Sequence, residues 1–316
     1  MKRMPREEVL DFLQKYVTRY RITEGKGFRL KDFDPGDTCG LQIEKAEATD
    51  LLKAGTAWLA EEQDMLYAQD RWSLLLVFQA MDAAGKDGTI NHVMSGVNPQ
   101  GCEVHAFKAP TAHELDHDFM WRCATQVPER GRIGVFNRSY YEEVLVVRVH
   151  PEFLQRQKLP PSLVDKNIWE QRFKTIRGFE RHLAQNGTKV LKFHLRVSKE
   201  EQRQRFLDRL EEPTKRWKFN MGDVAERKLW DKYMDAYEDA IRETSTDDAP
   251  WHVVPADNKY LARLVVSATV VEAMEGLKLS APKVKNSPEL QQVRQALLNE
   301  GADRPPAKRT KTPGSK

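Results

Sequence analysis

Short apolar runs alternate along the chain with longer segments in which apolar residues recur every three or four positions. Each run has the length of one strand and is apolar at successive positions, which is typical of strands buried on both faces of a sheet. The predicted strands are residues 73–80, 103–107, 132–136, 189–197 and 250–256. The predicted helices are residues 4–20, 46–70, 88–97, 111–126, 162–186, 198–211, 223–243 and 257–277. This alternation predicts an α/β fold, with a parallel β-sheet flanked by helices.

The pattern also predicts how the chain is organised. Its 316 residues suit one large α/β domain with additions, and no internal repeat interrupts it. We expect an N-terminal helix and loop over residues 1–45 and the α/β domain over residues 46–280. Residues 281–316 are rich in Pro, Lys and Thr, which predicts a basic, disordered tail.

Charge and composition narrow the classes of function. The tail has eight Lys/Arg against three Asp/Glu, a charge of +5, so a whole-chain charge of +4 leaves −1 on the rest. A protein-wide basic field for nucleic acid is therefore not expected. No apolar run approaches the roughly 18–20 residues that cross a bilayer. Three widely spaced cysteines (Cys39, Cys102 and Cys123) and the lack of an apolar leader predict a cytoplasmic protein without disulfides.

One strand–loop–helix segment resembles a phosphate-binding loop. In the run AMDAAGKDGT, Gly85 and Lys86 occupy the Gly-Lys positions of the pattern G-x-x-x-x-G-K-[ST], but Ala80 replaces its first Gly and Asp87 its Ser/Thr. The loop N–H groups, the helix N-terminus and the Lys86 ammonium would attract phosphate. The predicted phosphate-binding residues are Ala84, Gly85, Lys86, Asp87, Gly88 and Thr89. The alternative is an ordinary strand–helix turn with an exposed lysine.

Asp82 lies inside this loop, where a carboxylate would repel phosphate unless a cation lay between them. Because the Ser/Thr that would hold Mg²⁺ is replaced, Asp82 is the natural ligand for the metal, directly or through water. The alternative is that Asp82 caps a backbone N–H of the turn.

A second segment places polar residues after the predicted strand 132–136. Asn137, Arg138 and Glu142 follow its carboxyl end, which is where ligands bind in parallel sheets. Arg138 would stabilise charge on a transferring phosphoryl group, and Glu142 would orient a metal-bound water or the acceptor. The alternative is that Arg138 and Glu142 pair with each other at the surface.

A third segment concentrates cations around a predicted helix end. Arg205 and Arg209 are four residues apart and share one helix face, and Lys215, Arg216 and Lys218 follow Pro213. These residues predict a helical lid, at about residues 205–222, that closes over phosphates and excludes water. The alternative is an exposed helix with salt bridges to its own acidic residues.

The run His113-Glu114-Leu115-Asp116-His117 matches the zinc-binding pattern H-E-x-x-H. Its polar surroundings favour a different reading, a solvent-exposed helix start that is capped by Thr111.

Taken together, these phrases resemble the polyphosphate kinase 2 family. The phrases that carry the resemblance are AMDAAGKDGTINHV (80–93), FKAPT (107–111), GVFNRSYYEEVLVVRVHPE (134–152), RWKFN (216–220) and DKYMDAYEDAI (231–241). The resemblance implies a P-loop kinase fold like that of thymidylate kinase, a mobile lid, and commonly a tetramer. It implies inorganic polyphosphate and adenine nucleotides as substrates, with guanine nucleotides as further acceptors, and Mg²⁺ as cofactor, with Mn²⁺ as a substitute.

The resemblance also assigns roles to single residues. Asp82 matches the family's loop aspartate, which binds metal and orients the acceptor, and Lys86 matches the loop lysine. Arg138 and Lys218 match the arginine after the strand and the lysine of the lid, and Lys108 falls in the acceptor-phosphate region. Asn137-Arg138 with Glu142 resembles class III of the family, whose members accept both AMP and ADP.

Two other functions fit parts of the sequence. One is a nucleoside monophosphate kinase that uses ATP as its only donor. The other is a non-catalytic module that binds phosphate or nucleic acid, with the basic tail as its contact.

Overall fold

The computed structural model describes residues 14, 17–38, 40, 45–283 and 287–302, without the side chains of residues 45–48, 218, 301 and 302. These residues belong to two units, residues 1–280 and residues 281–316. The first unit holds a six-stranded sheet in the order β1-β6-β5-β2-β4-β3. Its strands are β1 (Arg21–Ile22), β2 (Ser73–Gln79), β3 (Cys102–Ala106), β4 (Ile133–Asn137), β5 (Thr188–Arg196) and β6 (Trp251–Pro255). All neighbours pair in parallel except β1 and β6, so the predicted α/β class is confirmed.

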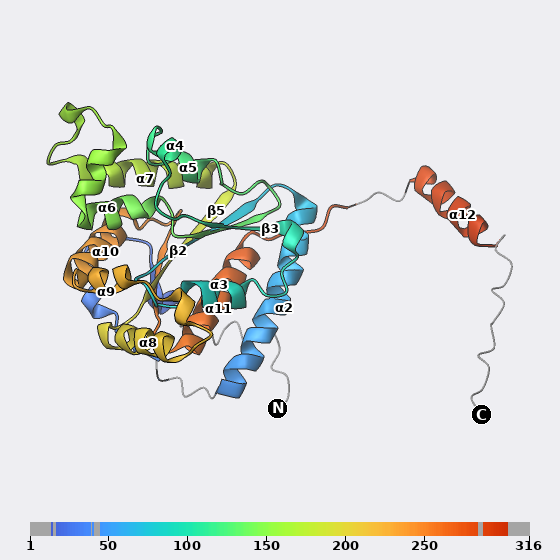
Figure 1. Ribbon diagram of the computed structural model, residues 1–316. Coiled ribbons are helices and arrows are strands. Elements are labelled where there is room, and N and C mark those ends of the chain that lie inside the picture. The colour runs from blue at the N-terminus through green and yellow to red at the C-terminus, as the bar shows by residue number, and fades with distance from the viewer. Residues whose placement is uncertain (1–13, 15–16, 39, 41–44, 284–286, 303–316) are drawn as a thin grey trace, which may run out of the picture. The chain divides into compact units, whose positions relative to one another are not determined.

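Helices cover both faces of this sheet (Figure 1). From residue 45 onward, the α-helices of the first unit are α2 (Lys45–Gln69), α3 (Lys86–Val93), α4 (Ala112–Leu115), α5 (Trp121–Ala124), α6 (Val146–Val149), α7 (Ile168–Gln185), α8 (Lys199–Glu211), α9 (Met221–Arg227), α10 (Trp230–Thr244) and α11 (Lys259–Gly276). Helices α2, α3 and α11 pack together on one side, and α6, α7 and α10 pack on the other. Strand β2 is apolar and fully buried because it lies at the centre of this arrangement. Within the part of the chain that the structure describes, no helix is both long and apolar enough to cross a membrane.

The five predicted strands are found within one residue of their expected bounds, and the predicted helices 46–70, 198–211 and 257–277 within two. Helix α3 ends four residues earlier than predicted, α7 begins six residues later, and two further predicted helices are each divided. The segment 111–126 forms α4 and α5 because the Asp118 carboxylate accepts a hydrogen bond from the N–H of Met120 (2.9 Å) and starts a new turn. The segment 223–243 forms α9 and α10, and α9 starts early because Asn220 caps it by accepting from the N–H of Gly222. Short 3₁₀ helices at Tyr140–Val144 and Pro151–Gln157 were not predicted.

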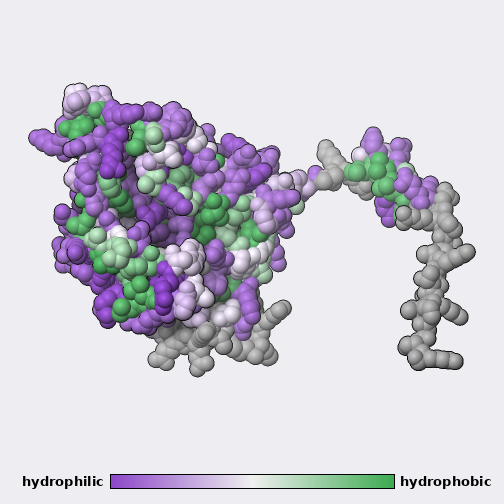
Figure 2. Space-filling model, in the orientation of Figure 1, coloured by the Kyte–Doolittle hydropathy of each residue, from purple (hydrophilic) through white to green (hydrophobic). Residues whose placement is uncertain are grey.

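The two ends of the chain differ from expectation in different ways. Most of the predicted helix 4–20 lies outside the described residues, although Gln14 and residues 17–20 are helical. In the second unit the expectation of disorder is wrong for α12 (Pro288–Ala302). Its exposed apolar residues, Leu290, Val293, Leu297 and Leu298, recur at helical spacing. Figure 2 shows hydrophobic residues gathered along α12. Residues 303–316 lie outside the described residues.

The core of the first unit contains an ion pair between Lys192 of β5 and Glu180 of α7. Their side chains are 0% and 1% exposed, and Lys192 Nζ lies 2.7 Å from Glu180 Oε2. Lys192 Nζ also donates to the carbonyl of Thr244 (2.7 Å) and to the hydroxyl of Tyr141 (3.0 Å). Burial lowers the pKa of Lys192, and Glu180 opposes that effect. The pair therefore joins strand to helix without contact with solvent.

Replacing Lys192 with Met is expected to lower the free energy of unfolding by about 3–5 kcal/mol, because Glu180 is left as a buried charge without its partner. Urea unfolding followed by circular dichroism measures the change. Lys189→Met is the matched control, since Lys189 lies on the same strand but is partly exposed, and it should change stability by less than about 1 kcal/mol. Equal losses in the two variants would contradict this account of the pair.

Candidate functional site

The loop between β2 and α3 has the shape of a phosphate-binding loop. Strand β2 ends at Gln79 and α3 begins at Lys86. Gly85 caps the helix with φ 103°, in the left-handed region that favours glycine. Ala83 also has a positive φ of 61°, which strains a residue with a Cβ. The turn leads directly into the N-terminus of α3, whose first N–H groups have no partner within the helix and attract anions.

Lys86 is folded into this loop. Its side chain is buried, which rules out the exposed lysine of the alternative reading. The ammonium donates a 2.7 Å hydrogen bond to the carbonyl of Ala80. Burial, followed by the nearby charge of Arg138, lowers the pKa of Lys86 to about 8. The cation is therefore only just stable at neutral pH, and an anion bound beside it would stabilise the charged form.

Arg138 lies between two carboxylates. Its guanidinium donates to Asp82 Oδ1 at 2.7 Å and to Glu142 Oε2 at 3.2 Å. The pKa of Arg138 is raised, most by Glu142 and then, against the effect of burial, by Asp82. The predicted pairing of Arg138 with Glu142 exists, but Glu142 is only 15% exposed, so the pair belongs to the site and not to the outer surface. Arg138 also has a positive φ of 66°, a strained conformation of the kind found at functional sites.

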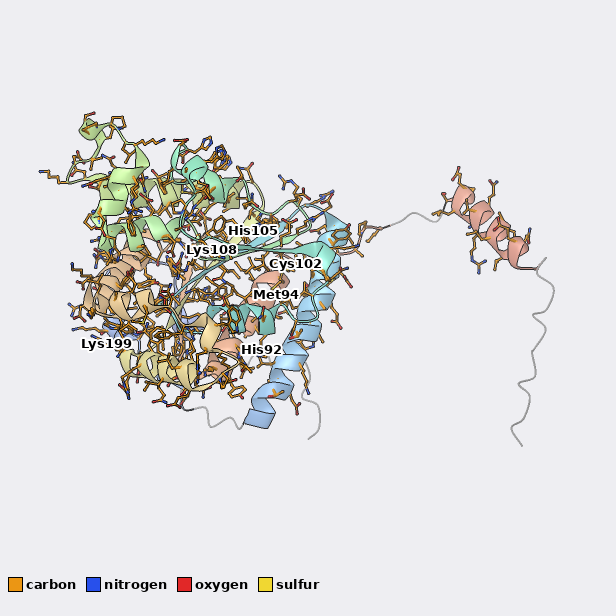
Figure 3. The ribbon with its side chains drawn as sticks, viewed as in Figure 1. His92, Met94, Cys102, His105, Lys108 and Lys199 are labelled. Carbon is orange, nitrogen blue, oxygen red and sulfur yellow. The ribbon has the colours of Figure 1, made fainter. Side chains whose placement is uncertain are left out.

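Neighbouring strands bring the predicted residues together. Asn137, the last residue of β4, donates from Nδ2 to Asp87 Oδ1 at 2.7 Å and so joins β4 to the first turn of α3. Lys108, labelled in Figure 3, follows the adjacent strand β3. These groups line one cleft of about 1090 Å³. The predicted residues that line it are Asp82, Ala84, Gly85, Lys86, Asp87, Gly88, Lys108, Asn137, Arg138, Arg209 and Lys215. Figure 2 shows a recess with mostly hydrophilic residues on this body.

The structure disagrees with the predicted phosphate contacts of two residues, Thr89 and Arg205. Thr89 is buried within α3, and its N–H is bonded to the carbonyl of Gly85, so it does not line the cleft. Arg205 is 5% exposed, and all five of its N–H donors have nearby acceptors on the protein. It has no donor left for a phosphate in this arrangement, so its predicted role in gripping phosphates is wrong.

Other residues of the predicted lid, Arg209, Lys215 and Trp217, border the cleft. Arg209 lies 3.9 Å from Asp223 of α9, and Lys215 is paired with Glu212. Trp217 is 76% exposed and also borders the cleft. The side chain of Lys218 lies outside the described residues.

The H-E-x-x-H run does not lie on one continuous helix. Helix α4 ends at Leu115, before the second histidine, and Glu114 and Thr111 form a reciprocal capping box. His117 stacks on Trp121 with ring centroids 4.0 Å apart. The capped helix start that the sequence predicts is confirmed.

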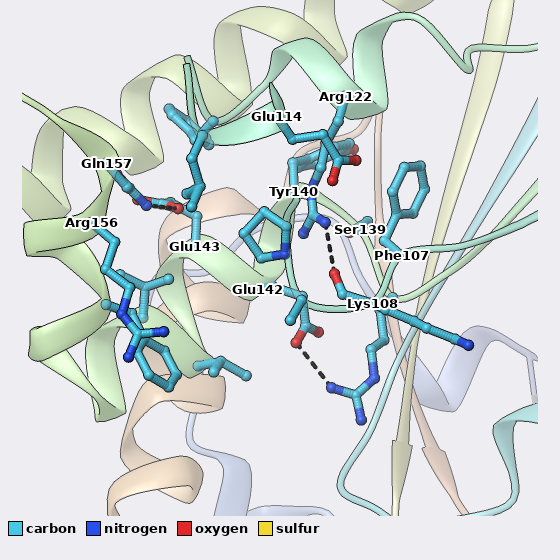
Figure 4. Close-up of a pocket in the computed structure, with 18 of the residues that line it drawn as sticks. Phe107, Lys108, Glu114, Arg122, Ser139, Tyr140, Glu142, Glu143, Arg156 and Gln157 are labelled. Atoms are coloured by element: carbon cyan, nitrogen blue, oxygen red, sulfur yellow. Dashed lines mark hydrogen bonds and ion pairs between the residues drawn. The ribbon is translucent and has the colours of Figure 1, made fainter. Parts of the chain in front are cut away.

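A second pocket of about 240 Å³ adjoins the cleft, and the sequence did not predict it. The two hollows share Phe107, Lys108, Ala109 and Arg138. Figure 4 shows Phe107 and Lys108 on one side of this pocket and Arg156 and Gln157 on the other. Arg122 lies over the ring of Phe107, 5.6 Å from its centroid, and donates to the carbonyl of Lys108 at 2.7 Å. The phrases 107–111 and 134–152 supply part of its lining, but the pocket itself was not predicted, because the rest comes from short helices and loops that are far apart in the sequence.

The positions of Asp82 and Glu142 show which carboxylate of the cleft suits the expected Mg²⁺. Among the described residues, no group of three or more His, Cys, Asp and Glu could hold a metal alone. Mg²⁺ commonly takes only one or two carboxylates and completes its shell with water and substrate phosphates, so the half-exposed Asp82 fits it. Glu142 is held by Arg138 and, with the Gln79 amide in its satisfied orientation, by a 2.8 Å bond from that amide. Glu142 therefore fits a supporting role better than a direct one.

A mostly parallel sheet, a phosphate-binding loop after one of its inner strands and a cleft lined by cations define a P-loop kinase. The profile of the family described as polyphosphate kinase 2 matches residues 42–282 of this chain. The chain therefore belongs to the polyphosphate kinase 2 family, and the resemblance seen in the sequence is confirmed.

Individual relatives agree with this assignment. The chain is 51% identical over 283 residues to the ADP-polyphosphate phosphotransferase of Rhodopseudomonas palustris, which covers 89% of this chain and 98% of that protein. It is 47% identical over 273 residues to the AMP/ADP-polyphosphate phosphotransferase of Meiothermus ruber, covering 86% and 98%. The crystal structure of polyphosphate kinase 2 from Arthrobacter aurescens superposes with a TM-score of 0.80 at 43% identity, covering 88% of this chain and 95% of that one.

Proposed function

We propose that this protein transfers a phosphoryl group reversibly between inorganic polyphosphate and AMP or ADP, forming ADP or ATP. The observation that carries the proposal is the cleft that joins the phosphate-binding loop, Lys86 and Arg138 to the cations of the lid. Such a site can hold several phosphates of a polyanion in a row, because positive groups border it from the loop, from β4 and from the lid. Relatives named for this reaction support the same conclusion.

The residues of the chain mainly hold and orient the reacting phosphates. The loop N–H groups and Lys86 hold the end of the polyphosphate chain. Arg138 stabilises the charge that spreads over the transferring group. The bond from the terminal phosphorus to its bridging oxygen breaks as an acceptor phosphate oxygen binds that phosphorus, and the shortened polyphosphate leaves with the bridging oxygen.

The acceptor nucleotide fits the smaller pocket beside the cleft. Its walls include the aromatic rings of Phe107 and Phe153 and the guanidinium groups of Arg122 and Arg156, which suit a base and its sugar. Lys108 and Arg138 border both hollows and would direct the acceptor phosphates toward the loop.

Asp82 is the residue that would hold Mg²⁺ or Mn²⁺, with Glu142 in support through Arg138. When bound, the metal neutralises phosphate oxygens as charge develops on them. Asp82 itself keeps its carboxylate at the loop, where Arg138 fixes its orientation at 2.7 Å.

An assay with separate donors tests the proposal. Purified protein is given polyphosphate and Mg²⁺ with AMP or with ADP, and the products are separated by chromatography. We expect ADP from AMP and ATP from ADP, and loss of both when EDTA removes the metal. A nucleoside monophosphate kinase would act only with ATP as donor. Binding that depends steeply on salt and is lost on truncation near residue 280, without any transfer, would favour the non-catalytic module and overturn the proposal.

The depressed pKa of Lys86 predicts a pH dependence. The amine is charged below about pH 8 and loses its proton as the pH rises through that value. We expect kcat/KM for polyphosphate, which reports the free enzyme, to fall up to tenfold for each pH unit above about 8. The kcat profile should fall at higher pH, because bound phosphate stabilises the charged amine. A Lys86→Arg variant, whatever its rate, should lose this decline, and an unchanged decline would show that another group titrates.

A further inference from the structure

Two side chains of α8 hold the back of the phosphate-binding loop. Gln202 Nε2 donates to the carbonyl of Asp82 at 2.9 Å. One guanidinium nitrogen of Arg205, Nη1, donates to the carbonyls of Ala83 and Ala84 at 3.1 and 2.8 Å. Three successive carbonyls of the loop are thus bound from one helix, by side chains that are 1% and 5% exposed.

These bonds determine which way the loop amides point. In a trans peptide the N–H of one residue points opposite to the C=O of the residue before it, and this chain has no cis peptide among its described residues. The carbonyls of Asp82 and Ala84 point to α8, so the N–H groups of Ala83 and Gly85 point away from it. Both residues line the cleft, where such amides form a cradle for anions.

Arg205 is itself held by parts of the protein outside the lid. Its Nη2 donates to the carbonyls of Ala256 and Asp257, in the connection between β6 and α11, at 2.6 and 3.2 Å. Its Nε donates to Glu201 at 2.7 Å. A lysine could not replace this set, because only guanidinium offers five donors in a planar fork.

Gln202 connects the loop with α9. Its amide oxygen accepts a 2.9 Å bond from Arg227, the last residue of α9. The contact therefore runs from α9 through Gln202 to the carbonyl of Asp82. The strained φ of Ala83 adds a reason for such support, because a residue in that region persists only when its surroundings hold it there.

We propose that Gln202 and Arg205 are positioning residues that keep the loop amides turned toward the polyphosphate. The inference rests on the proposed function of the cleft. Without these two side chains the loop peptides are free to rotate, and carbonyls that turn into the cleft repel phosphate. The nucleotide pocket contains neither residue, so the binding of AMP depends little on them.

The test uses Gln202→Leu and Arg205→Lys in the full chain, with Arg203→Lys as matched control. Arg203 lies on the same helix, is 49% exposed and is paired with Glu200. The readouts are the rise in melting temperature caused by inorganic tripolyphosphate, the rise caused by AMP, and KM and kcat for polyphosphate and ADP.

We expect both variants to lose most of the rise caused by tripolyphosphate and to keep the rise caused by AMP. Their KM for polyphosphate should increase about tenfold or more, as for loss of one to two hydrogen bonds to the loop, while KM for ADP changes less than about threefold. The control should match the wild type. If Arg205→Lys does not fold, Gln202→Leu decides, since it removes a neutral group.

Equal losses for tripolyphosphate and AMP, or a fall in kcat alone, would overturn the positioning role and leave a purely structural one. Failure of the proposed function is distinguishable, because the wild type would then transfer no phosphate from polyphosphate. The rises in melting temperature caused by tripolyphosphate and by AMP would still show whether the variants bind tripolyphosphate more weakly than the wild type does.

Discussion

Replacing Asp82 with Asn is expected to lower kcat/KM for polyphosphate roughly 10²–10³-fold, the range seen when one electrostatic group of an active site is removed. The amide keeps the size of the side chain but loses the charge that faces Arg138 at 2.7 Å. It is also a much poorer ligand for Mg²⁺ than a carboxylate. Steady-state rates over a range of polyphosphate concentrations measure the loss.

The control for this variant is Asp50→Asn, the same change on the exposed face of α2. It should leave both the rate and the melting temperature unchanged. The Asp82→Asn variant should keep the fold, because the Asp82 side chain is 30% exposed and is not part of the hydrophobic core. Turnover like that of the wild type would remove Asp82 from the mechanism.

Replacing Lys86 with Met is expected to lower kcat/KM by a similar factor, about 10²–10³, but without loss of stability. The unbranched side chain of Met fills much of the volume of the lysine stem. Burial of the ammonium lowers the pKa of Lys86 to about 8, so the charge opposes folding fully below that pH, and the effect fades as the pH rises from there to the ordinary value. Removing it should leave the free energy of unfolding equal or higher at neutral pH.

Activity assays together with urea unfolding separate the two effects. Lys53→Met, on the exposed face of α2, is the control and should change neither property. A variant that loses activity and stability together would mean that Lys86 acts through the fold of the loop, and not through its charge.

Most of the sheet could be predicted because β2, β4, β5 and β6 are almost wholly buried, whereas the two-residue strand β1 was not predicted. The run SLLLVFQ of β2 has no polar side that would allow another reading. Helix ends were harder, because a single side chain can decide them and leave the apolar period almost unchanged, as Asp118 does before α5 and Asn220 at the start of α9. Helix α12 was missed because the Pro and Lys residues around it outweighed its own apolar spacing.

In the site, too, some residues could be placed from the sequence pattern, whereas the direction of other side chains could not. The loop, Asp82 and Arg138 follow strands, so their convergence could be inferred from a parallel sheet. Arg205 and Arg209 share one face of α8, and the sequence cannot tell that the first turns inward to the loop carbonyls and the second toward Asp223. The tetramer stays a prediction.

Binding of Mn²⁺, measured by electron paramagnetic resonance with tripolyphosphate present, tests the central claim that the metal ligand has moved from the helix start into the loop. The account predicts that Asp82→Asn weakens Mn²⁺ binding by about tenfold or more, while Asp50→Asn binds like the wild type. Unchanged Mn²⁺ affinity in Asp82→Asn would contradict the claim.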